Sequence, residues 1–234
     1  MSEHTAKAFD ADLQELGRMV AEMGGLAEKQ IADAVGALAR RDAERGKGVV
    51  EVDVRIDALQ HDIEEKAVLT IARRQPMAVD LRVIVSALRI ANDLERIGDL
   101  AKNIAKRAAL TGDFHPYKLI RGVEHMAEMV LDQLKKVLDS YASRDLAEAL
   151  RVWNRDEEID AICISLFREL ITYMMEDPRN ITFCMHLMFT AKNIERMGDH
   201  ATNIAETIYF MIEGRAIADQ RPKGDTTTLE AAQL

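Results

Sequence analysis

The sequence predicts an all-α protein of two tandem three-helix bundles, related by a pseudo-two-fold duplication. Long runs rich in Ala, Leu, Glu, Arg and Met favour helix, and only four prolines interrupt the 234 residues. Apolar residues recur at steps of three and four, the spacing of an amphipathic helix. The two halves of the chain also share residues at fixed shifts, which indicates an internal duplication.

Three helices are predicted in the first half. The first carries one apolar stripe over residues 9–38, and the second is expected over about residues 44–73. Pro76 is expected at the first position of the third helix, where a missing N–H costs nothing. Its apolar residues keep a strict seven-residue repeat over 83–104, which predicts coiled-coil-like packing.

The second half repeats this plan. One helix is expected to follow Pro116, and another to run unbroken from about Leu146 to Met175. Asp177 is the expected N-cap of the last helix, with Pro178 at its first position. The predicted units are a first repeat (1–112), a second repeat (113–213) and a disordered C-terminal tail (214–234).

The duplication is visible letter by letter. Residues 91–105 match residues 191–205 at a shift of 100, with nine of fifteen positions identical. A second set matches at a shift of 103: Arg41-Asp42 with Arg144-Asp145, and Asp53, Ile56, Asp57 and Ala58 with Asp156, Ile159, Asp160 and Ala161. Unrelated amphipathic helices share Ala and Ile easily, but not a run of Glu, Arg, Gly, Asp and Asn.

Each copy of the matched helix carries a Glu and an Asp four residues apart. Such residues are neighbours on one helix face, and two anions there destabilise the helix by about 0.2–0.5 kcal/mol unless a cation neutralises them. A hard divalent or trivalent cation prefers carboxylate and amide oxygens. The candidate metal ligands are Glu95, Asp99, Glu195 and Asp199, with Asn103 and Asn203 in second rank.

A plainer interpretation stays open beside this one. Asp99 can pair with Lys102, and Glu195 with Lys192, as ordinary surface ion pairs. The acidic pattern is present in both copies, whereas Thr202 stands where the first copy has Lys102, and this favours the metal interpretation. None of the six histidines has an acidic residue three positions before it, so a ferritin-like di-iron motif is absent and the predicted site is oxygen-rich.

Composition excludes several classes of function. The net charge of −9 argues against nucleic acid and against direct adhesion to anionic lipid. Two cysteines cannot form a disulfide framework for a chain of this size, and the N-terminus has no apolar signal region, so a cytoplasmic protein is expected. Nucleotide-cradling glycine motifs and a hydrolase nucleophile elbow are absent from the sequence.

Four segments together resemble one known family. They are IARRQPMAVDLR (71–82), DLERIGDLAKNI (93–104), LITYMMEDPRNI (170–181) and NIERMGDHATNI (193–204). In order and spacing they resemble the PhoU family over roughly residues 5–214. The sequence departs from its own repeat at Asn193, which stands opposite the acidic Asp93.

The resemblance implies two PhoU repeats, each a three-helix bundle, and metal binding through E(D)xxxD motifs that fall on Glu95, Asp99, Glu195 and Asp199. It implies iron, magnesium or manganese as the metal, and a homodimer or a larger homo-oligomer. It further implies a non-enzymatic adaptor at the cytoplasmic face of the membrane, joining a phosphate ABC transporter to a sensor histidine kinase. Such an adaptor restrains phosphate uptake and keeps the starvation response off when phosphate is plentiful. The alternative is a carboxylate-bridged metal enzyme, redox or hydrolytic, on the same bundle.

Overall fold

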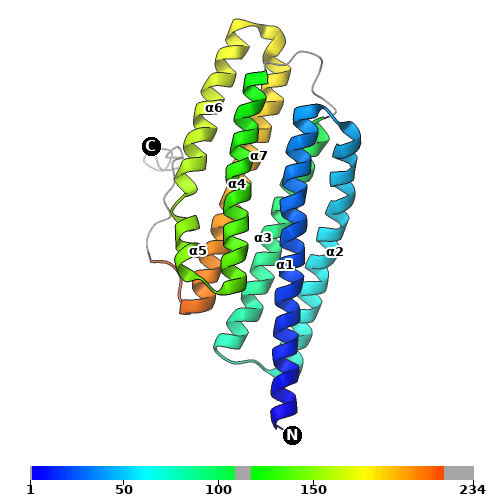
Figure 1. Ribbon diagram of the computed structural model, residues 1–234, viewed down its shortest axis with the longest axis vertical. Helices are drawn as coiled ribbons and strands as arrows, with labels where there is room; N and C mark the ends of the chain where they lie inside the picture. The colour runs from blue at the N-terminus through cyan, green and yellow to red at the C-terminus, as the bar shows by residue number, and fades with distance from the viewer. Residues whose placement is uncertain (1, 109–116, 219–234) are drawn as a thin grey trace, which may run out of the picture.

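The computed structural model describes residues 2–108 and 117–218, and this part of the chain contains helices and no strands (Figure 1). The all-α prediction is therefore confirmed. The elements are α1 (Ser2–Arg40), α2 (Ala43–Arg74), α3 (Val79–Ala108), α4 (Tyr117–Ser143), α5 (Leu146–Trp153), α6 (Asp156–Glu176), the short 3₁₀ helix η1 (Pro178–Asn180) and α7 (Ile181–Glu213).

The helices form two bundles that stand side by side (Figure 1). Helices α1–α3 pack together in the first bundle, and α4–α7 pack together in the second. The bundles meet where α3 lies against α7 and where α1 lies against α4. The expected boundary at residue 112 and residues 219–234 of the expected tail lie outside the described residues.

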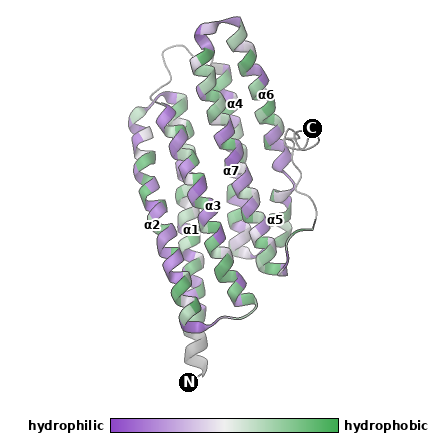
Figure 2. Ribbon diagram, turned by 180° about the vertical axis from the view of Figure 1, so that it is seen from behind, coloured by the Kyte–Doolittle hydropathy of each residue, from purple (hydrophilic) through white to green (hydrophobic). Residues whose placement is uncertain are grey.

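The apolar stripes of α3 and α7 form the centre of the molecule. Every member of the heptad stripe of α3 is buried, namely Val83, Ala87, Ile90, Leu94, Ile97, Ala101 and Ile104. Burying one large aliphatic side chain stabilises the fold by about 1.5–3 kcal/mol, so this stripe is a major source of stability. Hydrophilic and hydrophobic residues alternate along the helices (Figure 2), and no helix of the described part is long and apolar enough to cross a bilayer.

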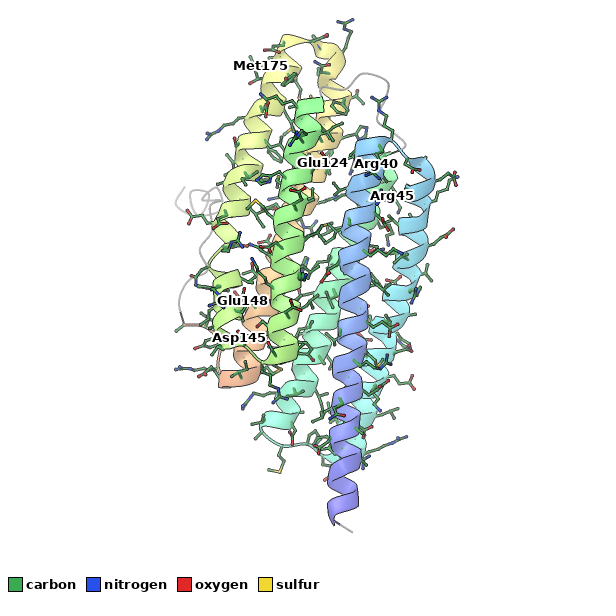
Figure 3. All side chains as sticks on the ribbon, viewed as in Figure 1. Arg40, Arg45, Glu124, Asp145, Glu148 and Met175 are labelled. Carbon is green, nitrogen blue, oxygen red and sulfur yellow. The ribbon has the colours of Figure 1, made fainter. Side chains whose placement is uncertain are left out.

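The turns that open α2 and α5 are copies of one another. Arg41 and Arg144 both adopt a left-handed backbone with φ of 57°. The next residue caps the following helix: the Asp42 carboxylate accepts a hydrogen bond from the backbone N–H of Arg45, and Asp145 accepts from two backbone N–H groups at the start of α5. Figure 3 labels Asp145 and Glu148 at this helix start. The Arg-Asp match at a shift of 103 thus reflects a duplicated left-handed turn and cap.

The prediction for the start of the third helix is wrong by three residues. Gln75 ends α2 in a left-handed conformation, with its N–H donating to the Ile71 carbonyl. Pro76 lies in the connection, and Ala78 also has a positive φ of 50°. The helix begins at Val79 because the carbonyl of Ala78, not that of Gln75, accepts the first helical hydrogen bond, from the N–H of Arg82.

The expectation of one unbroken helix from Leu146 to Met175 is also wrong. The chain breaks at Asn154 and Arg155, between α5 and α6. The side chain of Asn154 donates to the Leu150 carbonyl at 2.8 Å, and such local bonding competes with helix continuation. At the next corner, Asp177 accepts from the N–H of Arg179 and caps the short 3₁₀ helix η1. The last helix begins only at Ile181, with Asn180 as its N-cap, so the prediction that Asp177 caps it with Pro178 at its first position is wrong by three residues.

Candidate metal centres

The second and third helices of the first repeat bring four carboxylates together. Asp53 and Asp57 lie four residues apart on α2 and face Glu95 and Asp99 on α3. Asp57 is exposed, but partial desolvation against the helices raises its pKa, and the charges of Asp53 and Asp99 raise it further. Burial also raises the pKa of Glu95, with Asp99 and Asp57 adding to the effect and Arg96 opposing it. We call Asp53, Asp57, Glu95 and Asp99 the first cluster.

The second repeat builds the corresponding arrangement. Asp156 and Asp160 lie on α6, and Glu195 and Asp199 lie on α7; these four residues are the second cluster. Glu195 is only 8% exposed. Burial raises its pKa, Lys192 opposes this shift, and the charges of Asp199 and Asp160 reinforce it.

The sequence alone did not place the α2 and α6 members of these clusters at the candidate sites. A signal was present, because Asp53 and Asp57 match Asp156 and Asp160 at a shift of 103 and keep the same i, i+4 spacing. The matching α2 and α6 residues could therefore have been paired with the acids of α3 and α7. What the sequence could not show is which faces of these helices meet.

The two asparagines of second rank lie in different surroundings. Asn103 is exposed on α3. Asn203 is turned toward the other repeat, where its side-chain amide donates to the Asp93 carboxylate at 3.4 Å. Asp93 also lies 2.8 Å from His200, so this group of polar side chains joins α3 to α7 across the two bundles. The positions related to this pair by the duplication are uncharged, since Asn193 on α7 corresponds to Asp93 and Leu100 on α3 corresponds to His200.

Each cluster also has a buried glutamine from the first helix of its repeat. Gln30 on α1 and Gln133 on α4 are each 1% exposed and match at a shift of 103, a pair that sequence analysis did not identify. The amide of Gln30 donates to the Val49 carbonyl at 3.0 Å and reaches Asp53 at 3.5 Å. The amide of Gln133 donates to the Arg155 carbonyl at 3.3 Å.

Oxygen atoms in these side chains lack hydrogen-bond partners. The Oε1 atoms of Gln30 and Gln133 and one carboxylate oxygen of Glu195 are buried and accept no hydrogen bond. The Oε2 atom of Glu95 likewise accepts none, although the exposed Arg96 lies 3.4 Å away. A buried polar atom without a partner costs about 1–3 kcal/mol. Carbonyl and carboxylate oxygens are the ligands that a hard cation prefers, so the residues present fit such an ion.

The ion pairs of the plainer interpretation are also formed. Lys102 lies 2.5 Å from both Asp53 and Asp99, and Lys192 lies 2.7 Å from Glu195. Among the side chains that the structure describes, no three of His, Cys, Asp or Glu are already close enough together to hold a metal ion. The carboxylates would have to rotate toward a bound ion, and metal binding at Glu95, Asp99, Glu195 and Asp199 stays a prediction.

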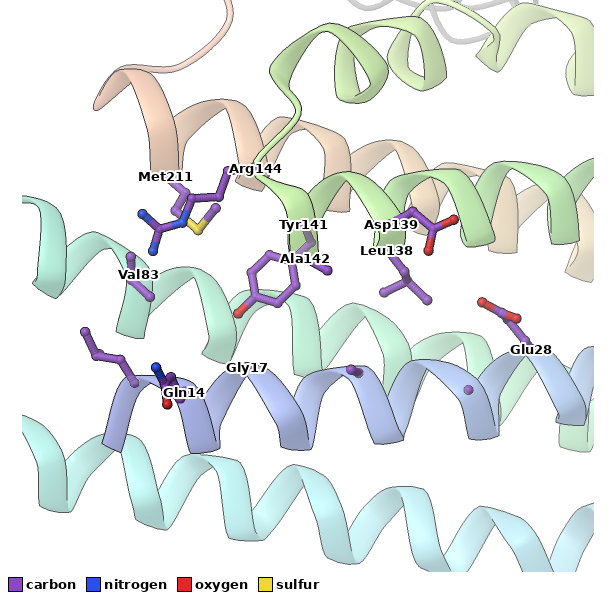
Figure 4. A pocket seen from close by; sticks show the side chains of 13 residues that line it. Gln14, Gly17, Glu28, Val83, Leu138, Asp139, Tyr141, Ala142, Arg144 and Met211 are labelled. Carbon is purple, nitrogen blue, oxygen red and sulfur yellow. The ribbon is translucent and has the colours of Figure 1, made fainter. Parts of the chain in front are cut away.

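A separate cavity of about 480 Å³ lies between α1 and α4. Figure 4 shows Tyr141 of α4 extending toward α1 near Gly17, while Glu28 and Asp139 approach one another at the other end. Burial raises the pKa of Tyr141 to about 12, so its hydroxyl stays protonated at neutral pH. The residues of the two clusters do not line this cavity, so the candidate metal centres are distinct from it.

The fold and the clusters together define a class of protein: duplicated three-helix bundles with one carboxylate-rich centre in each copy. The family model described as "PhoU domain" matches the chain twice, over residues 20–108 and 123–208. The chain belongs to the PhoU family.

Relatives and solved structures agree with this assignment. A protein of Rhizobium meliloti (strain 1021) is 58% identical over 226 residues, covering 96% of this chain and 95% of the relative, and is named a phosphate-specific transport system accessory protein PhoU homolog. The crystal structure of PhoU from Pseudomonas aeruginosa is 38% identical with a TM-score of 0.83, covering 88% of this chain and 100% of that one. A phosphate transport system regulatory protein PhoU from Streptococcus pneumoniae is 26% identical, with the same TM-score, over 90% and 100% of the two chains.

Proposed function

We propose that this protein restrains phosphate uptake and keeps the phosphate-starvation response off when phosphate is plentiful. It acts as an adaptor between a phosphate ABC transporter and a sensor histidine kinase, in the cytoplasm at the inner face of the membrane. The observation that carries the proposal is the near full-length match to relatives named as accessory proteins of phosphate-specific transport. The net charge of −9 favours contact through these protein partners rather than through lipid phosphates.

The two clusters supply the metal-binding part of the proposal. A divalent or trivalent ion, with iron, magnesium and manganese as candidates, would be held by Glu95 and Asp99 in the first repeat and by Glu195 and Asp199 in the second. A bound cation would neutralise the carboxylates and connect the second helix of each repeat to the third. The residues themselves orient the oxygens: Gln30, for example, holds Asp53 from α1.

The proposal also covers assembly and chemistry. We expect a homodimer or a larger homo-oligomer, and a regulator rather than an enzyme. A carboxylate-bridged metal enzyme would use the same clusters. Hydrolysis of a phosphate ester or reaction with oxygen, lost in a Glu95→Ala, Glu195→Ala double variant, would favour that alternative.

Deletion of the gene tests the regulatory role. In high phosphate, the deletion strain should express alkaline phosphatase constitutively, and the wild-type gene should restore repression. Normal repression in the deletion strain would contradict the proposed function. The Glu95→Ala, Glu195→Ala variant then tests the clusters, with Glu128→Ala as a control because that side chain is 78% exposed on α4. Repression by the double variant equal to that of the control would show that regulation does not need the clusters.

A further inference from the structure

We infer that the two clusters bind cations unequally, and that the second cluster is the stronger site. Lys102 already acts as an internal counter-cation in the first cluster, whereas a neutral threonine occupies the matching position in the second. This inference rests on the proposed metal binding and goes beyond it, because it states which cluster binds a cation first and which residue sets the difference in affinity.

Lys102 occupies the place where a cation would bridge α2 and α3. Its ammonium lies 2.5 Å from the Asp53 carboxylate on α2 and 2.5 Å from the Asp99 carboxylate on α3. Its side chain is 21% exposed and that of Asp53 is 6% exposed, so water screens the contact weakly. Burial opposes the charged ammonium, but the hydrogen bonds that it donates to Asp53 and Asp99 outweigh this and raise the pKa of Lys102. A metal ion must displace this ammonium before it can use both carboxylates.

The same position in the second cluster is Thr202, which is fully buried. Its hydroxyl donates to the Asp156 carboxylate, the counterpart of Asp53, at 3.0 Å. It also lies 3.1 Å from the Gly198 carbonyl, an ordinary contact within the helix. A hydroxyl carries no charge, so a cation that approaches Asp156 and Asp199 meets no ammonium at this position.

The lysine of the second cluster is held differently. Lys192 stands one turn before the acidic pair, bonds Glu195 at 2.7 Å and has a side chain 48% exposed. An exposed, flexible ammonium can move into water at small cost. The Oε2 atom of Glu195 and the Oε1 atom of Gln133 remain buried acceptors without hydrogen-bond partners. The first cluster keeps such acceptors too, at Oε2 of Glu95 and Oε1 of Gln30. The two clusters therefore differ in the ammonium of Lys102, which bridges two carboxylates of the first cluster and has only the hydroxyl of Thr202 as its counterpart in the second.

Mn²⁺ binding to the full chain tests the inequality by isothermal titration calorimetry and by electron paramagnetic resonance of free Mn²⁺. We expect two classes of site that differ in affinity by about tenfold or more, since a nearby like charge is strongly repulsive at low dielectric. Asp199→Asn should remove the tight class, and Asp99→Asn should leave it intact. Equal affinities in the wild-type protein, or a tight class lost in Asp99→Asn, would overturn the inference.

A residue exchange between the repeats tests the cause. Lys102→Thr should tighten the weak class about tenfold or more, and Thr202→Lys should weaken the tight class. Lys118→Thr is the control, because it removes one positive charge from a side chain that is 79% exposed on α4, and it should change neither class. Unchanged weak-class affinity in Lys102→Thr would overturn the role of this residue.

Folding and binding failures can be told apart. Circular dichroism reports the fold of each variant, and Lys102→Gln, which removes the charge but keeps a long polar side chain, replaces Lys102→Thr if that variant unfolds. Lys102→Thr should lose stability without metal and regain it with Mn²⁺, whereas a merely structural lysine would show no such recovery. If the wild-type protein bound no Mn²⁺ at either cluster, the proposed metal binding itself would be wrong. If it bound Mn²⁺ equally at both clusters, only the inferred inequality would be wrong.

Discussion

Alanine at Gly98 is expected to be less stable than alanine at Gly198, although the two glycines occupy matching positions. In a helix interior, Gly→Ala stabilises by about 1 kcal/mol when nothing else changes. A Cβ at position 98 would lie 2.9 Å from Gln30 Oε1 and 3.2 Å from Ile56 Cδ1. Gln30 cannot yield freely because it is 1% exposed and donates to the Val49 carbonyl. Overpacking of this kind costs about 1–3 kcal/mol, so after the helix-propensity gain Gly98→Ala should be destabilising by up to about 2 kcal/mol net.

The space beside Gly198 is larger than that beside Gly98. The nearest atom to an added Cβ is Ile159 Cδ1 at 3.1 Å, followed by Val130 Cγ2 at 3.7 Å and Gln133 Oε1 at 3.8 Å. A methyl group at the end of a side chain can move by a few tenths of an ångström, so most of the helix-propensity gain should survive. Gly198→Ala is therefore expected to be neutral or to stabilise the protein by up to about 1 kcal/mol.

Urea unfolding followed by far-ultraviolet circular dichroism measures both changes. A difference of 1 kcal/mol corresponds to about 2–4 °C in the thermal midpoint of a chain of this size. Gln30→Ala should relieve much of the Gly98→Ala defect, since it removes the oxygen that the new methyl group meets. The packing argument is refuted if Gly98→Ala is as stable as Gly198→Ala, or if the two changes at 30 and 98 are simply additive.

Three further predictions concern charge and burial. Burial raises the pKa of Glu195 above the unfolded value of 4.5, so the contribution of this residue to stability is full below pH 4.5 and is lost as the pH rises through the folded pKa. Glu195→Gln should flatten this decline of the unfolding free energy in metal-free protein, measured by urea unfolding at several pH values. An unchanged slope would contradict the prediction. Asp93→Asn should lower the unfolding free energy by about 1–3 kcal/mol, because a neutral amide replaces the carboxylate that lies 2.8 Å from the His200 ring. A thermal midpoint unchanged from wild type would count against this. Glu206→Ala should leave the indole N–H of Trp153 without the carboxylate that accepts from it at 3.0 Å, at a cost of about 1–3 kcal/mol in unfolding free energy. Trp153 is the one tryptophan of the chain, so its fluorescence reports the change directly. The same emission and stability as wild type would show that the bond contributes nothing.

The sequence predicts the helices well because their signals are local. The stripe of α3 keeps its period over seven buried positions, and the cap at Asp42 recurs at Asp145 with the same preceding turn. Two of the helix boundaries that were predicted wrongly are decided by competing local bonds. A left-handed Ala78 delays the start of α3, and the side chain of Asn154 ends α5 early.

Only half of each cluster could be predicted from the sequence. The acids of α3 and α7 stand in an obvious repeat, but the sequence does not say which face of α2 or α6 meets them. Gln30 and Gln133 are invisible as site residues without the fold, since a single glutamine in a helix is usually exposed. Only packing shows that these two amides are buried and that Gln30 lies beside the Asp53 carboxylate of another helix.

The contact between Asp93 and His200 makes the two repeats depend on one another. Asn193 and Leu100 stand at the corresponding places, so the contact exists once rather than twice. Two copies of the first repeat would bring an acid against a leucine, and two copies of the second would bring an asparagine against a histidine. Each half thus carries a residue whose partner is present only in the other half. A homodimer of either half could not reproduce the pairing that the full chain forms within itself.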